Sequence, residues 1–231
     1  MTNPDQPAGR GHELMMSAVG QYAKEQNILL LQPEKVRKNE EFLEVIKSLK
    51  PDICIVVAYG KILPQELLDI PPMGFLNVHT SLLPKYRGAA PIQHALMHGE
   101  KITGLTVQQM SLGMDEGDIL VQESWNISPT DTTGVLFEKT SMRAGPLLIE
   151  ALVGLENKTI SPRPQNHDEA TYTKMIEKKD GELKTDWTID EVYHRWQAYT
   201  PWPGLYTDFS GTKVTLLEIE KKAHTGIPGE W

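Results

Sequence analysis

The sequence GFLNVHTSLLPKYRGAAPIQ, residues 74–93, contains a short predicted strand that carries two polar side chains near its end. Apolar residues within 75–78 follow a turn rich in proline and glycine, a pattern typical of a strand. Because side chains alternate between the two faces of a strand, we expect Asn77 and His79 to point the same way. An amide and an imidazole where a strand ends in a loop are typical of a site on an open α/β sheet. A polar strand end without function is the alternative.

The flanking regions predict an α/β fold. Apolar periodicity predicts helices over 14–26, 39–49, 65–68, 90–97 and 132–155, and apolar runs predict strands over 28–31, 53–58, 105–110 and 119–121. This alternation is typical of a mainly parallel sheet. The β-branched run 53–58 is expected to be buried on both faces. Residues 1–13, which contain several prolines and glycines, are expected to form an exposed loop.

The later part of the chain predicts a linker and then a second unit. Residues 156–175 are polar and resemble a linker. Thr188 and Glu191 form a predicted capping box, with Trp187 and Val192 as its hydrophobic staple. A strand is expected over 214–219. We therefore divide the chain into an α/β domain (1–160), a linker with a helix (161–198) and the beginning of a C-terminal β domain (199–231).

Composition and charge narrow the class of protein. The 231 residues are 39% hydrophobic and 23% charged, as in ordinary globular proteins. The net charge of −8 argues against non-specific coating of nucleic acid. The first residues lack the apolar segment of a signal peptide, so none is expected, and no apolar run is long enough to cross a membrane. The single cysteine, Cys54, cannot form an internal disulfide, so a reducing, cytoplasmic setting is expected.

A local excess of positive charge surrounds the Asn77–His79 pair. Residues 74–99 contain no Asp or Glu, whereas Lys85 and Arg87 are present. This window suits an anionic ligand.

A carboxylate near His79 would orient the imidazole. Asp115 is the first candidate, because it lies in a glycine-flanked loop (113–117) between two predicted strands. Glu116 and Asp118 are its rivals. With such an acid, the imidazole and the amide could stabilise an oxyanion or move a proton.

Other candidate chemistry is weaker. His94 and His98 have the i,i+4 spacing of two metal ligands, but the glutamate of the zinc-protease motif is absent, so a solvent-facing helix surface is preferred. Cys54 lies in a predicted core strand without a basic neighbour and is not expected to be a nucleophile.

Asn77 and His79, followed by residues 81–84 and by Arg87 and Gly88, resemble the signature of the formyltransferases that use 10-formyltetrahydrofolate. Asp115 matches the family's loop acid, and its separation of 38 residues from Asn77 fits the family spacing, which favours it over its rivals. The resemblance covers nearly the whole chain. It implies a Rossmann-like formyltransferase domain followed by an OB-like β-barrel, with the family's first strands and most of its barrel missing here.

Residues 7–11, 88–93 and 201–204 resemble the family members that formylate initiator methionyl-tRNA. The resemblance implies that Asn77 and His79 stabilise the oxyanion and that Asp115 orients His79 and assists proton movement. It implies no metal, no membrane and no obligate protein partner. The folate site would comprise Tyr59, Gly60, Lys61, Ile62, Leu63, Ser81, Leu82, Leu83, Pro84 and Asp118, and the tRNA contacts would be Arg10, Lys85 and Arg87.

Two alternatives remain open from the sequence. One is a related enzyme that formylates an amino sugar or hydrolyses the formyl-folate. The other is a fragment that binds folate or RNA without catalysis, because both ends are expected to be truncated.

Overall fold

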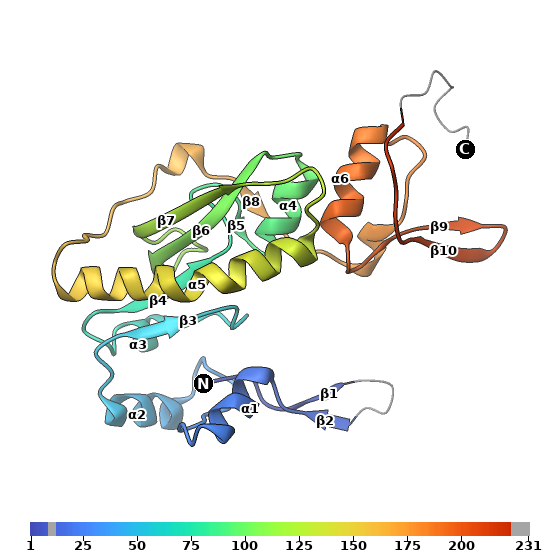
Figure 1. The fold of residues 1–231 in the computed structure, drawn as a ribbon. Coiled ribbons are helices and arrows are strands. Elements are labelled where there is room, and N and C mark those ends of the chain that lie inside the picture. The colour runs from blue at the N-terminus through green and yellow to red at the C-terminus, as the bar shows by residue number, and fades with distance from the viewer. Residues whose placement is uncertain (9–12, 223–231) are drawn as a thin grey trace. The chain divides into compact units, whose positions relative to one another are not determined.

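The computed structural model describes residues 1–8 and 13–222, which divide into two compact units (Figure 1). The first unit is Met1–Leu76 and the second is Asn77–Trp231. Each is described by itself.

The first unit contains three helices and three short strands among the described residues. Helix α2 begins after the N-cap Asn39, whose side chain accepts a hydrogen bond from the Phe42 amide. It ends at Leu49, with Lys50 as its C-cap just before Pro51. This agrees with the sequence prediction. The elements are β1 (Gln6–Ala8), β2 (Glu13–Met15), α1 (Ala18–Glu25), α2 (Glu40–Leu49), β3 (Cys54–Val56) and α3 (Gln65–Leu68).

Three predictions for this unit were wrong. The expected loop 1–13 includes β1, which pairs antiparallel with β2, a contact between separated residues that local composition does not reveal. Residues 28–31 form no strand. The strand at 53–58 shrinks to β3 and is not buried on both faces, because Ile55 remains 39% exposed. Cys54, Ile55 and Val56 all contribute to the lining of a cavity of about 600 Å³.

The sheet that carries the candidate site has the strand order β3-β4-β6-β7. Its other strands are β4 (Phe75–His79), β6 (Ile102–Gln109) and β7 (Ile119–Asn126), and the boundary between the two units falls within β4. Strands β6 and β7 pair in antiparallel orientation. Their register is irregular at Val107 and Gln108, next to the loop that contains Asp115.

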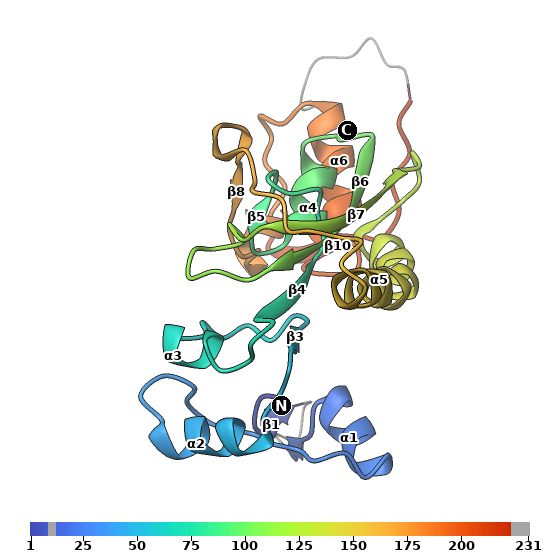
Figure 2. The ribbon, with the colours of Figure 1, turned by 90° about the vertical axis from the view of Figure 1, so that its left-hand side faces the viewer.

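Three helices accompany this sheet in the second unit. They are α4 (Pro91–Met97), α5 (Thr133–Glu156) and α6 (Ile189–Tyr199), and α5 runs along β6 and β7 while α4 and α6 lie together (Figures 1 and 2). Ile92, Leu136 and Ala198, one from each helix, are at most 1% exposed and belong to one core cluster. Among the described residues, no helix is both long and apolar enough to cross a membrane.

The helix α6 begins as its sequence predicts. The Thr188 hydroxyl accepts from the Glu191 amide at 3.2 Å, and the Glu191 carboxylate accepts from the Thr188 amide at 2.9 Å. Trp187 and Val192 both pack against the core cluster. The capping box is therefore confirmed. Beyond α6, β9 (Leu205–Phe209) and β10 (Thr212–Leu216) form an antiparallel hairpin.

The predicted linker is structured. Strand β8 (Tyr172–Thr173) pairs in parallel with β5 (Arg87–Gly88), and Arg163 exchanges two main-chain hydrogen bonds with Ile119 at 2.8 and 2.9 Å. Two 3₁₀ turns, His167–Glu169 and Lys178–Gly181, also lie in this part of the chain. Residues 163–173 thus form part of the body of the second unit rather than a free connection.

The interface of α4 with this segment makes stability depend on pH. His94 is 9% exposed, and burial is the main cause that lowers its pKa. The positive charges of His98 and Lys174 lower this pKa further. The hydrogen bond to the Lys174 carbonyl and the negative charge of Asp180 oppose this shift. Because the pKa of His94 is lower in the folded than in the unfolded protein, the neutral ring favours folding at neutral pH. This contribution to the unfolding free energy is lost as the pH falls through the pKa of the folded state.

We expect His94→Gln to reduce the loss of unfolding free energy between about pH 7.5 and about pH 5. Glutamine keeps a donor for the Lys174 carbonyl but cannot be protonated. Urea unfolding at the two pH values measures the difference. His98→Gln at the end of the same helix is the control, and an equal effect of both substitutions would contradict the assignment to His94.

Candidate active site

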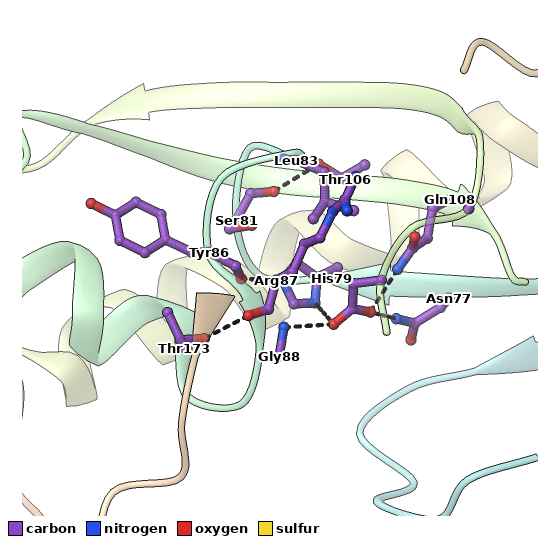
Figure 3. Close-up of polar contacts among 12 residues, drawn as sticks. Asn77, His79, Ser81, Leu83, Tyr86, Arg87, Gly88, Thr106, Gln108 and Thr173 are labelled. Atoms are coloured by element: carbon purple, nitrogen blue, oxygen red, sulfur yellow. Dashed lines mark hydrogen bonds and ion pairs between the residues drawn. The ribbon is translucent and has the colours of Figure 1, made fainter. Parts of the chain in front are cut away.

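Strand β4 presents Asn77 and His79 to one carboxylate, that of Asp115. The Asn77 side-chain nitrogen donates to Asp115 Oδ1 at 3.4 Å, and His79 Nδ1 lies 3.6 Å from Oδ2. Figure 3 shows Asn77, His79, Gln108 and Gly88 converging on this point. The prediction that Asn77 and His79 point the same way is confirmed. Asn77 and Asp115, 38 residues apart in the sequence, are in contact.

The Asp115 carboxylate is held by further donors. The Gly88 amide donates to Oδ2 at 2.9 Å, and Gln108 Nε2 donates to Oδ1 at 2.7 Å. Asp115 itself adopts a left-handed backbone with φ of 52°. Donors on both oxygens therefore hold the carboxylate in place.

The His79 ring is fixed by its other nitrogen. Nε2 lies 2.8 Å from the Tyr86 carbonyl oxygen, which can only accept, so Nε2 carries a hydrogen. Nδ1 then faces Asp115. Both ring nitrogens face acceptors, and a neutral ring satisfies only one of them. The pair is therefore suited to exchanging a proton.

The rival acids do not take this place. Glu116 lies 3.7 Å from the Arg87 guanidinium and accepts from the Tyr172 hydroxyl at 3.3 Å. The main-chain oxygen of Asp118 accepts from the Gln109 amide at 2.8 Å. Among the ion pairs of the described residues, the one that His79 forms is with Asp115.

The loop 81–84 is shaped by buried contacts. Ser81 is 1% exposed and donates to the Lys85 carbonyl at 2.7 Å. The Thr106 hydroxyl donates to the Ser81 carbonyl and accepts from the Leu83 amide (Figure 3). Leu83 is buried, whereas Leu82 and Pro84 are half-buried. Ser81 and Leu83 therefore shape the expected folate loop, and Leu82 and Pro84 keep exposed surface.

The other expected folate segment, Tyr59 to Leu63, belongs to the first unit. Lys61 Nζ donates to the carbonyls of Pro33 and Glu34 at 2.8 and 2.9 Å, which anchors this loop. Leu63 is buried, whereas Gly60 and Ile62 are exposed. Burial raises the pKa of the Tyr59 phenol.

The expected tRNA contacts differ in accessibility. Lys85 is exposed, with its amine 3.8 Å from Glu100. Arg87 is completely buried, and its guanidinium contacts Gln165 and the Tyr172 hydroxyl, so the role in direct tRNA binding does not fit its environment. Arg10 lies outside the described residues.

The prediction that His94 and His98 lie on a solvent-facing helix surface was wrong for His94. This residue is buried, and its Nε2 is hydrogen-bonded to the Lys174 carbonyl. No group of three metal-ligating side chains occurs among residues 1–8 and 13–222.

Sequence reasoning missed Gln108. It is 1% exposed, and its side-chain oxygen is buried without a hydrogen-bond partner while its nitrogen holds Asp115. Side chains alternate between the two faces of a strand, so Gln108 must point to the opposite face from Val107, and this alternation along β6 could have identified it.

We expect Gln108→Met to lower kcat by about 3- to 30-fold, because the carboxylate loses one of its donors, worth about 1.5–3 kcal/mol in a charged hydrogen bond before relaxation. Stability should change little, because the substitution also removes the unpaired side-chain oxygen. Steady-state kinetics and thermal melting measure the two effects. An unaltered kcat would show that Gln108 does not support Asp115.

The site is thus an acid–imidazole–amide centre at the end of a strand in an α/β fold, as in enzymes that polarise a carbonyl and move a proton. The model of the family "Formyl transferase" matches residues 1–152, and that of "Formyl transferase, C-terminal domain" matches residues 175–231. The chain belongs to the formyl transferase family. The family resemblance, the α/β formyltransferase fold class and the enzyme class predicted from the sequence are confirmed.

Curated relatives belong to the same family, and solved structures share the fold. A methionyl-tRNA formyltransferase of Koribacter versatilis is 43% identical over 230 residues, which cover 100% of this chain and 74% of the relative. A methionyl-tRNA formyltransferase structure from Clostridium thermocellum is 18% identical with a TM-score of 0.63, covering 87% of this chain and 86% of that one. HypX from Aquifex aeolicus in complex with tetrahydrofolic acid is 22% identical with a TM-score of 0.66, over 81% of this chain but only 33% of HypX.

Proposed function

We propose that the protein transfers the formyl group of 10-formyltetrahydrofolate to the α-amine of initiator methionyl-tRNA, for translation initiation. The observation that carries the proposal is the convergence of Asn77 and His79 on Asp115 within a chain of the formyl transferase family. The names of the relatives support methionyl-tRNA as the acceptor, and the folate bound by HypX supports the donor.

In the proposed reaction, the amine nitrogen attacks the formyl carbon and a tetrahedral oxyanion forms. The Asn77 amide stabilises that oxyanion with the hydrogen that it does not donate to Asp115, and the His79 ring contributes positive charge when it takes up a proton during the reaction. Asp115 orients His79 and takes part in moving the amine proton towards the folate N10, which leaves as the carbon–nitrogen bond breaks. The donors and neighbours around Asp115 keep it placed for this step.

The surroundings divide into two substrate regions in this proposal. The residues assigned to folate are 59–63 in the first unit and, in the second unit, 81–84 and Asp118. Ile62 and Leu82 each keep accessible surface. The tRNA contacts are Arg10 and Lys85. Cytoplasmic localisation and the division into domains 1–160, 161–198 and 199–231 belong to the same proposal.

The decisive experiment supplies labelled 10-formyltetrahydrofolate and measures label in methionyl-tRNA. Initiator tRNA is compared with elongator methionyl-tRNA, with an amino-sugar nucleotide and with water as acceptors. We expect transfer to initiator methionyl-tRNA at the highest kcat/KM. Label transfer to the sugar, or release as formate, would replace the proposal by one of the two enzyme alternatives, and no turnover with any acceptor would favour a binding fragment.

A further inference from the structure

A buried side chain from the predicted linker contacts the main chain of the catalytic loop. Gln165 is 5% exposed, and its Nε2 donates to the carbonyl of Asp115 at 2.8 Å and to that of Gly117 at 2.6 Å. These two bonds lie on either side of Glu116. They hold the stretch in which Asp115 adopts a left-handed backbone, a conformation that costs a non-glycine residue about 1–2 kcal/mol.

The orientation of the Gln165 amide is determined by its neighbours. Its Oε1 accepts from Arg87 Nε at 3.1 Å and from a terminal guanidinium nitrogen at 2.7 Å. Guanidinium groups only donate and carbonyl groups only accept, so a flipped amide would oppose like groups on both sides. Gln165 thus joins the Arg87 side chain to the main chain of the Asp115 loop.

Arg87 is a rigid anchor for this bridge. It is 0% exposed, and it also donates to the Tyr172 hydroxyl at 3.0 Å. Its main chain pairs with β8, and the Thr173 hydroxyl donates to its carbonyl at 3.0 Å (Figure 3). The next residue, Gly88, gives its amide to the Asp115 carboxylate. Arg87 therefore connects to Asp115 twice, through Gln165 to its main chain and through Gly88 to its side chain.

We propose that Gln165, anchored by Arg87, is a positioning residue for formyl transfer: it holds the Asp115 main chain so that the carboxylate faces His79 and Asn77. This inference rests on the proposed function. It assigns residues 163–173, which the sequence indicated to be a linker, a part in catalysis.

The test compares two buried glutamines with similar contacts. Gln197 is also 5% exposed and donates to two main-chain carbonyls, of Pro129 and Asp131, at 2.9 and 2.7 Å. These contacts join α6 to the residues before α5 and involve none of the residues around Asp115. Gln197→Met is therefore the control for loss of stability in Gln165→Met.

We expect Gln165→Met to lower kcat by about 10- to 100-fold, a size known for small misplacement of catalytic groups, with the KM of both substrates within about threefold. Gln197→Met should lower the melting temperature comparably and leave kcat within about twofold. Gln165→Glu retains the acceptor for Arg87 and should also lower kcat. Equal kcat losses in the Gln165 and Gln197 variants, at equal folded fraction, would overturn the proposal.

A double-mutant cycle tests the route through Asp115. Gln165→Met combined with Asp115→Asn should be no slower than Asp115→Asn alone, because the positioned carboxylate is already absent. Multiplicative losses would show that Gln165 acts elsewhere.

Amide hydrogen exchange separates this inference from the proposed function, since it needs no turnover. Exchange at Gly88 and in residues 115–117 should accelerate in Gln165→Met and remain unchanged in Gln197→Met. Equal exchange in the two variants would refute the positioning role even in an active enzyme. Absence of formyl transfer by the unmodified chain, with the exchange difference present, would refute the function and leave the loop support standing.

Discussion

Asp115→Asn should lower kcat for formyl transfer by about 10³-fold, within the range for removal of a general acid–base group. The amide keeps the size of the carboxylate but loses its charge, and its nitrogen must face either the Gly88 amide or Gln108 Nε2, both of which donate. His79→Ala, which removes the ring that faces Asp115, should have a similar effect. Single-turnover assays with saturating substrates measure the chemical step.

The matched control for this prediction is Asp168→Asn. Asp168 is an exposed carboxylate in the 3₁₀ turn 167–169, and its replacement should leave kcat within about twofold, as is usual for surface positions. Circular dichroism at the assay temperature verifies that each variant is folded. Full activity in folded Asp115→Asn would remove the basis of the proposed mechanism.

Gly88→Ala should both destabilise the fold and slow the reaction. Gly88 has φ of 101°, and a Cβ there would lie 2.5 Å from the Thr173 carbonyl oxygen, a main-chain atom of β8. Separating β5 from β8 also moves the amide that holds Asp115. We expect a loss of about 2–5 kcal/mol in unfolding free energy, the sum of backbone strain and overpacking, and at least about a tenfold loss of kcat.

Gly211→Ala isolates the contribution of the backbone angle. Gly211 has φ of 79° in the β9–β10 turn, and a Cβ at this position would meet no other part of the protein within 4 Å. Its substitution should cost only about 1–2 kcal/mol and leave kcat unaltered. Denaturant unfolding of both variants gives the comparison, and equal losses would show that the contact with Thr173 is unimportant.

Local patterns predicted the elements whose causes are local. The helix over 39–49 has an N-cap at Asn39 and a stop before Pro51, and the capping box of Thr188 and Glu191 forms as expected. Both depend on residues three to four apart, which a sequence displays directly. The prediction of a strand over 53–58 that is buried on both faces was wrong, because the burial of Ile55 depends on which residues pack against it.

The candidate site divides in the same way. Alternation along β4 placed Asn77 and His79 on one side, and the family pattern selected Asp115. The support around that acid could not be predicted, because Gln108 and Gln165 approach it from a strand and from a polar segment without a motif. The hydrogen bonds from Gln108 and Gln165 to Asp115 join residues that are 7 and 50 positions apart in the sequence.

By itself the sequence determined the family, the proposed reacting trio and the helices with local caps, since these depend on residue type and short spacing. The tertiary structure decided that Arg87 is a buried anchor rather than a surface cation and that residues 163–173 pack against the loop that carries Asp115. The physical reason is burial: a guanidinium withdrawn from water must have its donors satisfied, and the pairing of β5 with β8 brings Gln165 and Tyr172 to satisfy them.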